Sequence, residues 1–132
     1  DNEIILVSQY RSAFNDYVLE IPAGMRDVVG EDPARTAWRE LAEETGYVPK
    51  TVEYLGSCLS SPGITDSVLE LFIARDVVAG GSAPEGPEEQ EMKVLVLPFF
   101  EALTMVDEGK ITDAKSSVGI LLAARRFHDL GL

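Results

Sequence analysis

Residues 31–47 read EDPARTAWRELAEETGY, and this segment contains the signals of a helix with defined ends. Asp32 can cap the first turn, and Pro33 suits the first helical position, where no backbone N–H is needed. Gly46 suits the left-handed residue that follows a last turn. The segment therefore predicts a helix over residues 33–45.

The predicted helix has two faces of different character. Its small and apolar side chains recur at spacings of three and four and are expected to pack on a sheet. They are Ala34, Ala37, Trp38, Leu41 and Thr45. On another face, Glu43 and Glu44 point within about 60° of Glu40. At about 5 Å and an effective dielectric of about 20, each such pair repels by about 3 kcal/mol, so these carboxylates either spread into water or bind cations.

The segments around this helix alternate between strand-like and helix-like patterns. Runs of β-branched and aromatic residues predict five strands. These strands are residues 3–10, 17–21, 52–59, 68–74 and 92–97. Two further helices are expected at residues 99–107 and 116–130, and an acidic Gly- and Pro-rich loop at residues 79–89. Strands interleaved with helices indicate an α/β (or α+β) fold with a sheet packed between helices.

The composition fits one globular domain over residues 1–132, with 45% hydrophobic and 26% charged residues. The apolar residues form no run near the eighteen or so that span a bilayer, and the first residues lack the features of a signal peptide. Cys58 is the only cysteine, which excludes an intrachain disulfide. We therefore expect a cytoplasmic protein without a membrane segment.

The charge balance limits the partners. Eleven basic and 23 acidic residues give a formal net charge of −12, which disfavours binding to nucleic acid or to anionic lipid. A substrate that contains phosphate would need a cation between itself and this surface. Most of the acidic residues are expected to be solvated surface charges, the ordinary role of scattered Asp and Glu.

The glutamates of the predicted helix suit a hard divalent cation. Carboxylate oxygens on a rigid element are ligands that Mg²⁺ and Mn²⁺ prefer, and both ions bridge to phosphates. Arg39 lies four residues before Glu43 and can orient a carboxylate there. A zinc site has little to build from, because His128 is the only histidine and Cys58 the only thiol. Mg²⁺, or Mn²⁺, is the expected cofactor.

The order of these residues resembles a known signature. Glu31 is followed by seven residues and then by Arg39-Glu40-Leu41-Ala42-Glu43-Glu44-Thr45-Gly46-Tyr47, which resembles the signature of the Nudix hydrolase family. In that family five residues usually separate the first glycine from the first glutamate, whereas six separate Gly24 from Glu31. We expect this extra residue to alter the loop and not the helix. The resemblance implies a mixed β-sheet sandwiched between helices.

The resemblance also implies roles for the signature residues. Glu40 and Glu44 would be direct metal ligands, and Glu43 a further ligand or a catalytic base. Arg39 would organise these carboxylates. Glu31 would be an outer ligand, and the backbone carbonyl of Ala23 or Gly24 would complete the coordination. A glycine suits that position because it lets backbone approach an ion closely, although a simple turn after Pro22 is the alternative.

A second catalytic carboxylate is expected on a loop. In the ADP-ribose pyrophosphatase branch of the family, a loop glutamate acts on the attacking water, and residues 87–91 hold the similar position here. Glu91 is the first choice for this base and Glu89 the second, because Gln90 can occupy the same column. The alternative is an acidic loop without a role.

Similarity to that branch extends over nearly the whole chain. It includes Gln9-Tyr10-Arg11, Glu20-Ile21-Pro22-Ala23-Gly24, Ser61-Pro62-Gly63 and residues 109–115, which end at Lys115. By analogy, Arg11 contacts substrate phosphate or positions Glu20, Glu20 holds the organic part of the substrate, and Gly63 lies in the substrate site. A strand-end ion pair is the alternative for Arg11 and Glu20, and a surface charge for Lys115.

The implied reaction is hydrolysis of a pyrophosphate bond in a nucleoside diphosphate derivative. ADP-ribose, cut to AMP and ribose 5-phosphate, is the leading substrate; other nucleotide sugars, a modified nucleoside triphosphate, and binding without catalysis are the alternatives. Phe14, Tyr17 and Tyr54 either stack a base or lie in the core. A homodimer is expected by family analogy. The branch usually has an N-terminal β segment, which we expect to be missing here or replaced by another mode of recognition.

Overall fold

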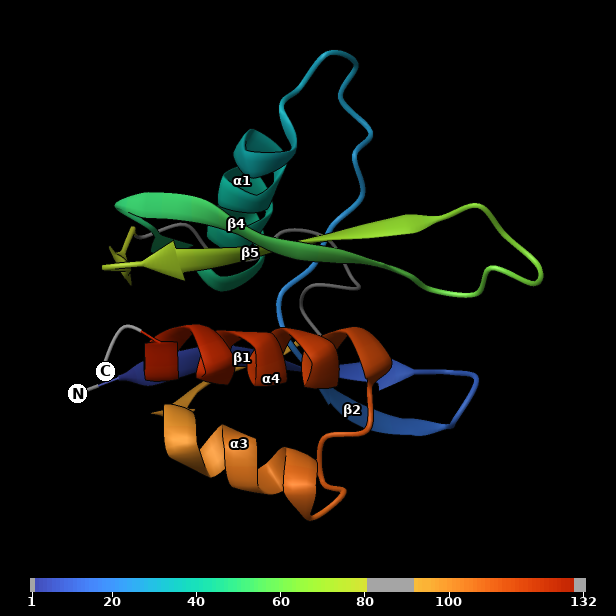
Figure 1. Cartoon of the computed structure of the whole chain (residues 1–132), viewed down its shortest axis with the longest axis vertical. Coiled ribbons are helices and arrows are strands. Elements are labelled where there is room, and N and C mark those ends of the chain that lie inside the picture. Colours follow the sequence, from blue (N-terminus) through green and yellow to red (C-terminus); the bar gives the residue numbers. More distant parts are fainter. Residues whose placement is uncertain (1, 81–91, 130–132) are drawn as a thin grey trace.

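The computed structural model describes residues 2–80 and 92–129 (Figure 1). Its elements follow in the order β1 (Glu3–Arg11), β2 (Asp16–Glu20), α1 (Pro33–Thr45), β3 (Tyr47–Val48), β4 (Thr51–Leu59), β5 (Val68–Arg75), β6 (Val78–Ala79), β7 (Lys93–Pro98), α3 (Phe99–Asp107) and α4 (Ala114–Asp129). The α/β class is confirmed. No helix in these described ranges is long and apolar enough to cross a membrane.

The strands pair in three antiparallel ladders. β1 lies between β2 and β7, with Val7 opposite both Glu20 and Val94. β4 pairs with β5 in a hairpin, and the two-residue strands β3 and β6 pair with each other. A short turn joins β1 to β2 and a longer loop, residues 60–67, joins β4 to β5; both are direct connections of the kind that antiparallel neighbours allow. The division into separate ladders is a detail that the sequence did not predict.

The helices cover these ladders on different sides. Figure 1 shows α1 beside the β4–β5 hairpin, and α4 and α3 beside the ladder that contains β1. α4 also contacts β4 and β5, so it joins the two parts of the molecule. The main core lies under α3 and α4. Its buried members are Leu6, Phe99, Ala102, Ile111 and Ile120.

The ends of α1 are those the sequence predicted, with one difference at the start. Gly46 takes the left-handed conformation, with φ 75°, and its N–H donates to the carbonyl of Ala42 at 2.9 Å. Asp32 occupies the N-cap position, but its side chain makes no capping hydrogen bond. Pro33 needs no N–H partner, which reduces the demand for a cap.

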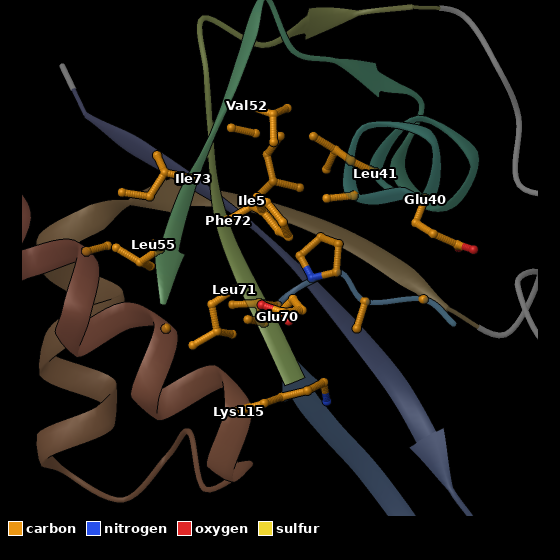
Figure 2. Close-up of a pocket in the computed structure, with 18 of the residues that line it drawn as sticks. Ile5, Glu40, Leu41, Val52, Leu55, Glu70, Leu71, Phe72, Ile73 and Lys115 are labelled. Carbon is orange, nitrogen blue, oxygen red and sulfur yellow. The ribbon is translucent and has the colours of Figure 1, made fainter. Parts of the chain in front are cut away.

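A cleft of about 840 Å³ lies between β1 and the β4–β5 hairpin (Figure 2). Ala23, Gly24 and Glu40 are among its lining residues, as is Lys115 of α4. Figure 2 shows Glu40 and Lys115 on different sides of this space, which apolar side chains of β4 and β5 such as Val52 and Leu71 also line. The fold therefore places part of the acidic face of α1 beside a largely apolar cleft.

Candidate functional site

Arg39 is the centre of the acidic face of α1. Its guanidinium lies 3.1 Å from Glu31, 3.2 Å from Glu43, 3.3 Å from Glu40 and 3.5 Å from Asp27. Hydrogen bonding to Glu31 is the largest cause of the raised pKa of Arg39, so its charge is permanent. One arginine thus contacts four carboxylates, which leaves an excess of negative charge. Asp27 was not among the predicted site residues, because it lies in a loop without periodicity.

Glu31 is held away from solvent on the arginine side of this cluster. Its carboxylate accepts hydrogen bonds from Arg39 and, at 2.8 Å, from the hydroxyl of Thr36. The hydrogen bonds from Arg39 and Thr36 lower the pKa of Glu31. In this conformation Glu31 orients Arg39, which is compatible with the outer position that the sequence predicted for it.

The surroundings of Glu40 disfavour the charged form of its carboxylate. Its side chain is 17% exposed. Burial raises the pKa of Glu40, Arg39 lowers it, and the neighbouring charges of Glu43 and Asp27 raise it further, with a net upward result. A cation bound beside Glu40 would favour its charged form. Part of the negative charge that Arg39 does not neutralise therefore lies on Glu40, a potential metal ligand.

Residues 23 and 24 lie directly against the acidic face. The N–H of Ala23 donates to Oε2 of Glu44 at 3.2 Å. A Cβ added to Gly24 would lie 2.0 Å from Cδ of Glu40, a distance that real side chains do not adopt. Gly24 therefore permits a close approach of the backbone to the α1 carboxylates. A turn after Pro22 alone would not require this close approach.

The donor set fits a hard divalent cation by its chemistry. Glu40, Glu43 and Glu44 supply carboxylate oxygens, and the backbone at residues 23–24 passes beside them. Within residues 2–80 and 92–129, however, no three Asp, Glu, His or Cys side chains converge closely enough to hold a metal ion. Glu40 and Glu43 are turned toward Arg39, so side-chain rotation is needed for convergence.

A second charged cluster surrounds Glu20 at the end of β2. Arg11 donates two hydrogen bonds to the Glu20 carboxylate, at 2.7 and 2.8 Å, and Nζ of Lys115 donates a third at 2.7 Å. Glu20 is 3% exposed. Burial acts to raise the pKa of Glu20, but the hydrogen bonds from Arg11 and Lys115 outweigh it and lower the pKa. The ion pair foreseen as an alternative is therefore present, and Lys115 takes part in it.

Gly63 is a predicted site residue that does not lie at α1. Gly63 lies in the turn between β4 and β5, which Figure 1 shows at the end of the hairpin that points away from α1. Glu89 and Glu91 lie outside the described residues. Phe14, Tyr17 and Tyr54 are 77%, 54% and 54% exposed, so the expectation that they lie in the core is wrong.

Known proteins resemble this chain in sequence. A model of the NUDIX domain matches residues 1–118. A methanol dehydrogenase activator of Bacillus methanolicus is 37% identical over 120 residues, which are 91% of this chain and 64% of that protein. An ADP-ribose pyrophosphatase of Bacillus subtilis (strain 168) is 33% identical over the same shares. A GDP-mannose pyrophosphatase of Cronobacter sakazakii is 33% identical over 86% of this chain and 62% of its own length. The chain thus spans less than two thirds of these relatives.

A solved structure has the same fold. The crystal structure of an ADP compounds hydrolase superposes with a TM-score of 0.87 over 99% of this chain and 69% of that chain. The sequence identity is 22%. This similarity concerns the arrangement of helices and strands alone.

Proposed function

This chain belongs to the Nudix family, and from that premise we propose that it hydrolyses the pyrophosphate bond of a nucleoside diphosphate derivative with the help of Mg²⁺ or Mn²⁺. The observation that carries the proposal is the contact of Gly24 and Ala23 with Glu40 and Glu44. It brings the backbone of residues 23–24 beside the carboxylates of α1, on a face with too few positive charges. Such a face attracts divalent cations.

In this proposal the helix α1 holds the metal. Glu40 and Glu44 are direct ligands, Glu43 is a further ligand or base, and the carbonyl of Ala23 or Gly24 completes the set. Glu31 is an outer ligand acting through Arg39. A divalent ion held there would neutralise charge on the phosphate oxygens and lower the pKa of a water molecule.

The chain's own residues then direct the reaction. The oxygen of water attacks one phosphorus atom, the bridging P–O bond breaks, and the water proton passes to a carboxylate. Glu43 is one candidate for this base, because its side chain is 53% exposed and reaches solvent beside Arg39. Glu91, and after it Glu89, are the candidates from the loop. Arg39 donates hydrogen bonds to both oxygens of Glu31, so this carboxylate does not compete for the proton.

ADP-ribose is the substrate we propose first, with AMP and ribose 5-phosphate as products. Relatives of 33% identity are named as ADP-ribose pyrophosphatases in two bacteria. Relatives of 32–33% identity are named as GDP-mannose pyrophosphatases, so another nucleotide sugar is the second candidate. A modified nucleoside triphosphate is the third.

We propose three residues for substrate binding, and their surroundings favour this role to different degrees: Arg11, Glu20 and Gly63. Arg11 has a side chain that is 45% exposed, so it can contact a phosphate while it holds Glu20. Glu20 is buried and already accepts hydrogen bonds from two cations, which favours a positional role over contact with the substrate. Gly63 has open space around it that can admit a ligand.

The experiment is an incubation of the purified protein with Mg²⁺ and a panel of ADP-ribose, GDP-mannose and nucleoside triphosphates, scored by kcat/KM. We expect ADP-ribose to give AMP and ribose 5-phosphate, and EDTA to stop the reaction. Preference for another member of the panel would change the substrate and keep the reaction. Binding without turnover would instead support a nucleotide-binding module.

The assembly proposal is a single domain over residues 1–132 that forms a homodimer. Light scattering should give twice the 14.4 kDa of the chain, and denaturant unfolding monitored by two probes should give one coincident transition. A monomer mass would contradict the dimer, and two separate transitions would contradict the single domain.

A further inference from the structure

The first turn of α4 holds the segment that follows β2. The N–H of Ile21 donates to Oγ of Ser116 at 2.9 Å. Ser116 is 0% exposed, and its hydroxyl donates in turn to the carboxylate of Asp113. The hydroxyl is therefore engaged as both donor and acceptor, so its orientation is fixed and the Ile21 N–H has a specific partner.

Charge pairing strengthens the same junction. Nζ of Lys115 lies 2.7 Å from Oε1 of Glu20 and 2.9 Å from Oδ2 of Asp113. With Arg11 on the other side of Glu20, two cations and two carboxylates balance each other. Partners of opposite charge are what a buried carboxylate needs in order to remain charged.

The opposite end of the segment rests on α1. Ala23 donates to Glu44, and Gly24 lies against the side chain of Glu40. Pro22 stands between the two contacts and fixes its own φ angle, so the segment has little conformational slack. A shift at Ile21 would therefore reach the backbone that faces the α1 carboxylates.

We propose that Asp113, Lys115 and Ser116 are positioning residues that hold Ala23 and Gly24 against the carboxylates of α1. They act through the backbone of residues 20–24 and contact neither metal nor substrate. The expected effect of this contact, tighter binding of the metal, rests on the proposed function. The positioning of Ala23 and Gly24 depends only on the contacts of Ser116, Lys115 and Ala23.

The test is Ser116→Ala, with Ser117→Ala as the matched control. Ser117 is the next residue of α4, and its hydroxyl donates to the carbonyl of Ile111 at 3.4 Å. In the metal-free protein we expect Ser116→Ala to speed hydrogen exchange at the Ala23 amide about fivefold, the effect of one net hydrogen bond. Calorimetric titration with Mn²⁺ should show a Kd raised by a similar factor. Ser117→Ala should leave both quantities within about twofold of wild type.

A second pair of variants separates position from direct contact and serves if Ser116→Ala does not fold. Lys115→Met should weaken Mn²⁺ binding and speed exchange at Ala23, and Lys115→Arg should restore most of both. Wild-type exchange and Mn²⁺ affinity in folded Ser116→Ala would overturn the inference. So would a Lys115→Met protein in which KM alone rises, since that result assigns Lys115 to the substrate. If the wild-type protein binds no Mn²⁺, the proposed function fails, and the exchange rate of Ala23 still decides the positional link.

Discussion

The two charged clusters differ in their balance of charge. Around Glu20, Arg11 and Lys115 supply two cations for a carboxylate that is 3% exposed. On α1, Arg39 is shared by four carboxylates. The first cluster is neutral with Asp113 included, and the second keeps an excess of negative charge.

The difference suggests different roles for the two clusters: the Glu20 cluster stabilises the fold, and the α1 cluster is the candidate functional site. A buried carboxylate without partners would be costly, so the Glu20 cluster is complete as it stands and joins β2 to α4. Repulsion among the α1 carboxylates is left without full compensation, and departures of that kind are expected at functional sites. The unbalanced cluster is therefore where a divalent cation would bind with the greatest effect.

The largest loss of activity is expected from Glu44→Gln. Loss of this proposed metal ligand should lower kcat/KM at least about 100-fold, because metal stabilisation of the transition state is worth several kcal/mol. Folding should be nearly unchanged, since the amide oxygen can still accept from Ala23. Glu101→Gln on the exposed side of α3 is the control and should keep full activity. Unchanged turnover of Glu44→Gln at saturating Mg²⁺ would remove its assigned role.

A smaller loss is expected from Gly24→Ala. The new Cβ must displace the side chain of Glu40, which it would otherwise meet at 2.0 Å. We expect kcat/KM to fall about 10- to 100-fold, the range seen when groups that support a metal ligand are changed. Gly56→Ala is the matched substitution, because its added Cβ would meet only Leu122, at an ordinary contact distance of 3.4 Å. Equal activity of Gly24→Ala and wild type would mean that Glu40 can move without consequence.

Removal of the shared cation Arg39 should lower both the stability of the metal-free protein and its activity. Arg39→Gln leaves its four carboxylates without that arginine, so the protein should melt a few degrees lower in EDTA and recover part of this loss in Mg²⁺. Turnover should fall about tenfold. The exposed Arg125→Gln on α4 is the control. Thermal unfolding with and without Mg²⁺ measures the effect, and an equal response of both variants to Mg²⁺ would contradict it.

The balanced cluster should appear as a modest pH dependence of stability. The pKa of Glu20 is lowered in the folded protein, so its contribution is present above the ordinary glutamate pKa of about 4.3 and is lost as pH falls through the folded value. In Glu20→Gln the free energy of unfolding should therefore fall less steeply with acidification. Urea denaturation from about pH 6 to pH 3 measures this slope, and parallel curves for the two proteins would refute the prediction.

The sequence predicted the elements that have strong local signals. α1 has the bounds that Pro33 and Gly46 indicate, because both residues act on the backbone next to them. β3 and β6 were missed, since two residues carry no periodicity. The signature also indicated which carboxylates lie near Arg39, because helical spacing fixes neighbours of Arg39 such as Glu43.

Local sequence patterns did not predict the contacts between segments that are distant in the sequence. Ile21 and Ser116 are bonded although 95 positions separate them, and no spacing rule connects them. The partnership of Lys115 with Glu20 was likewise not foreseen. Asp27 joined the Arg39 cluster from an irregular loop. Such contacts depend on how whole elements pack, which one sequence does not encode in a local pattern.

The most direct test is a crystal structure of the protein with Mn²⁺ and a non-hydrolysable ADP-ribose analogue, using the anomalous signal of manganese. We expect manganese between the analogue's pyrophosphate and the carboxylates of Glu40 and Glu44, with the Glu40 side chain turned away from Arg39. Manganese bound elsewhere, with Glu40 still on Arg39 and Glu44 still on the Ala23 amide, would contradict the assignment of α1 as the metal-binding helix.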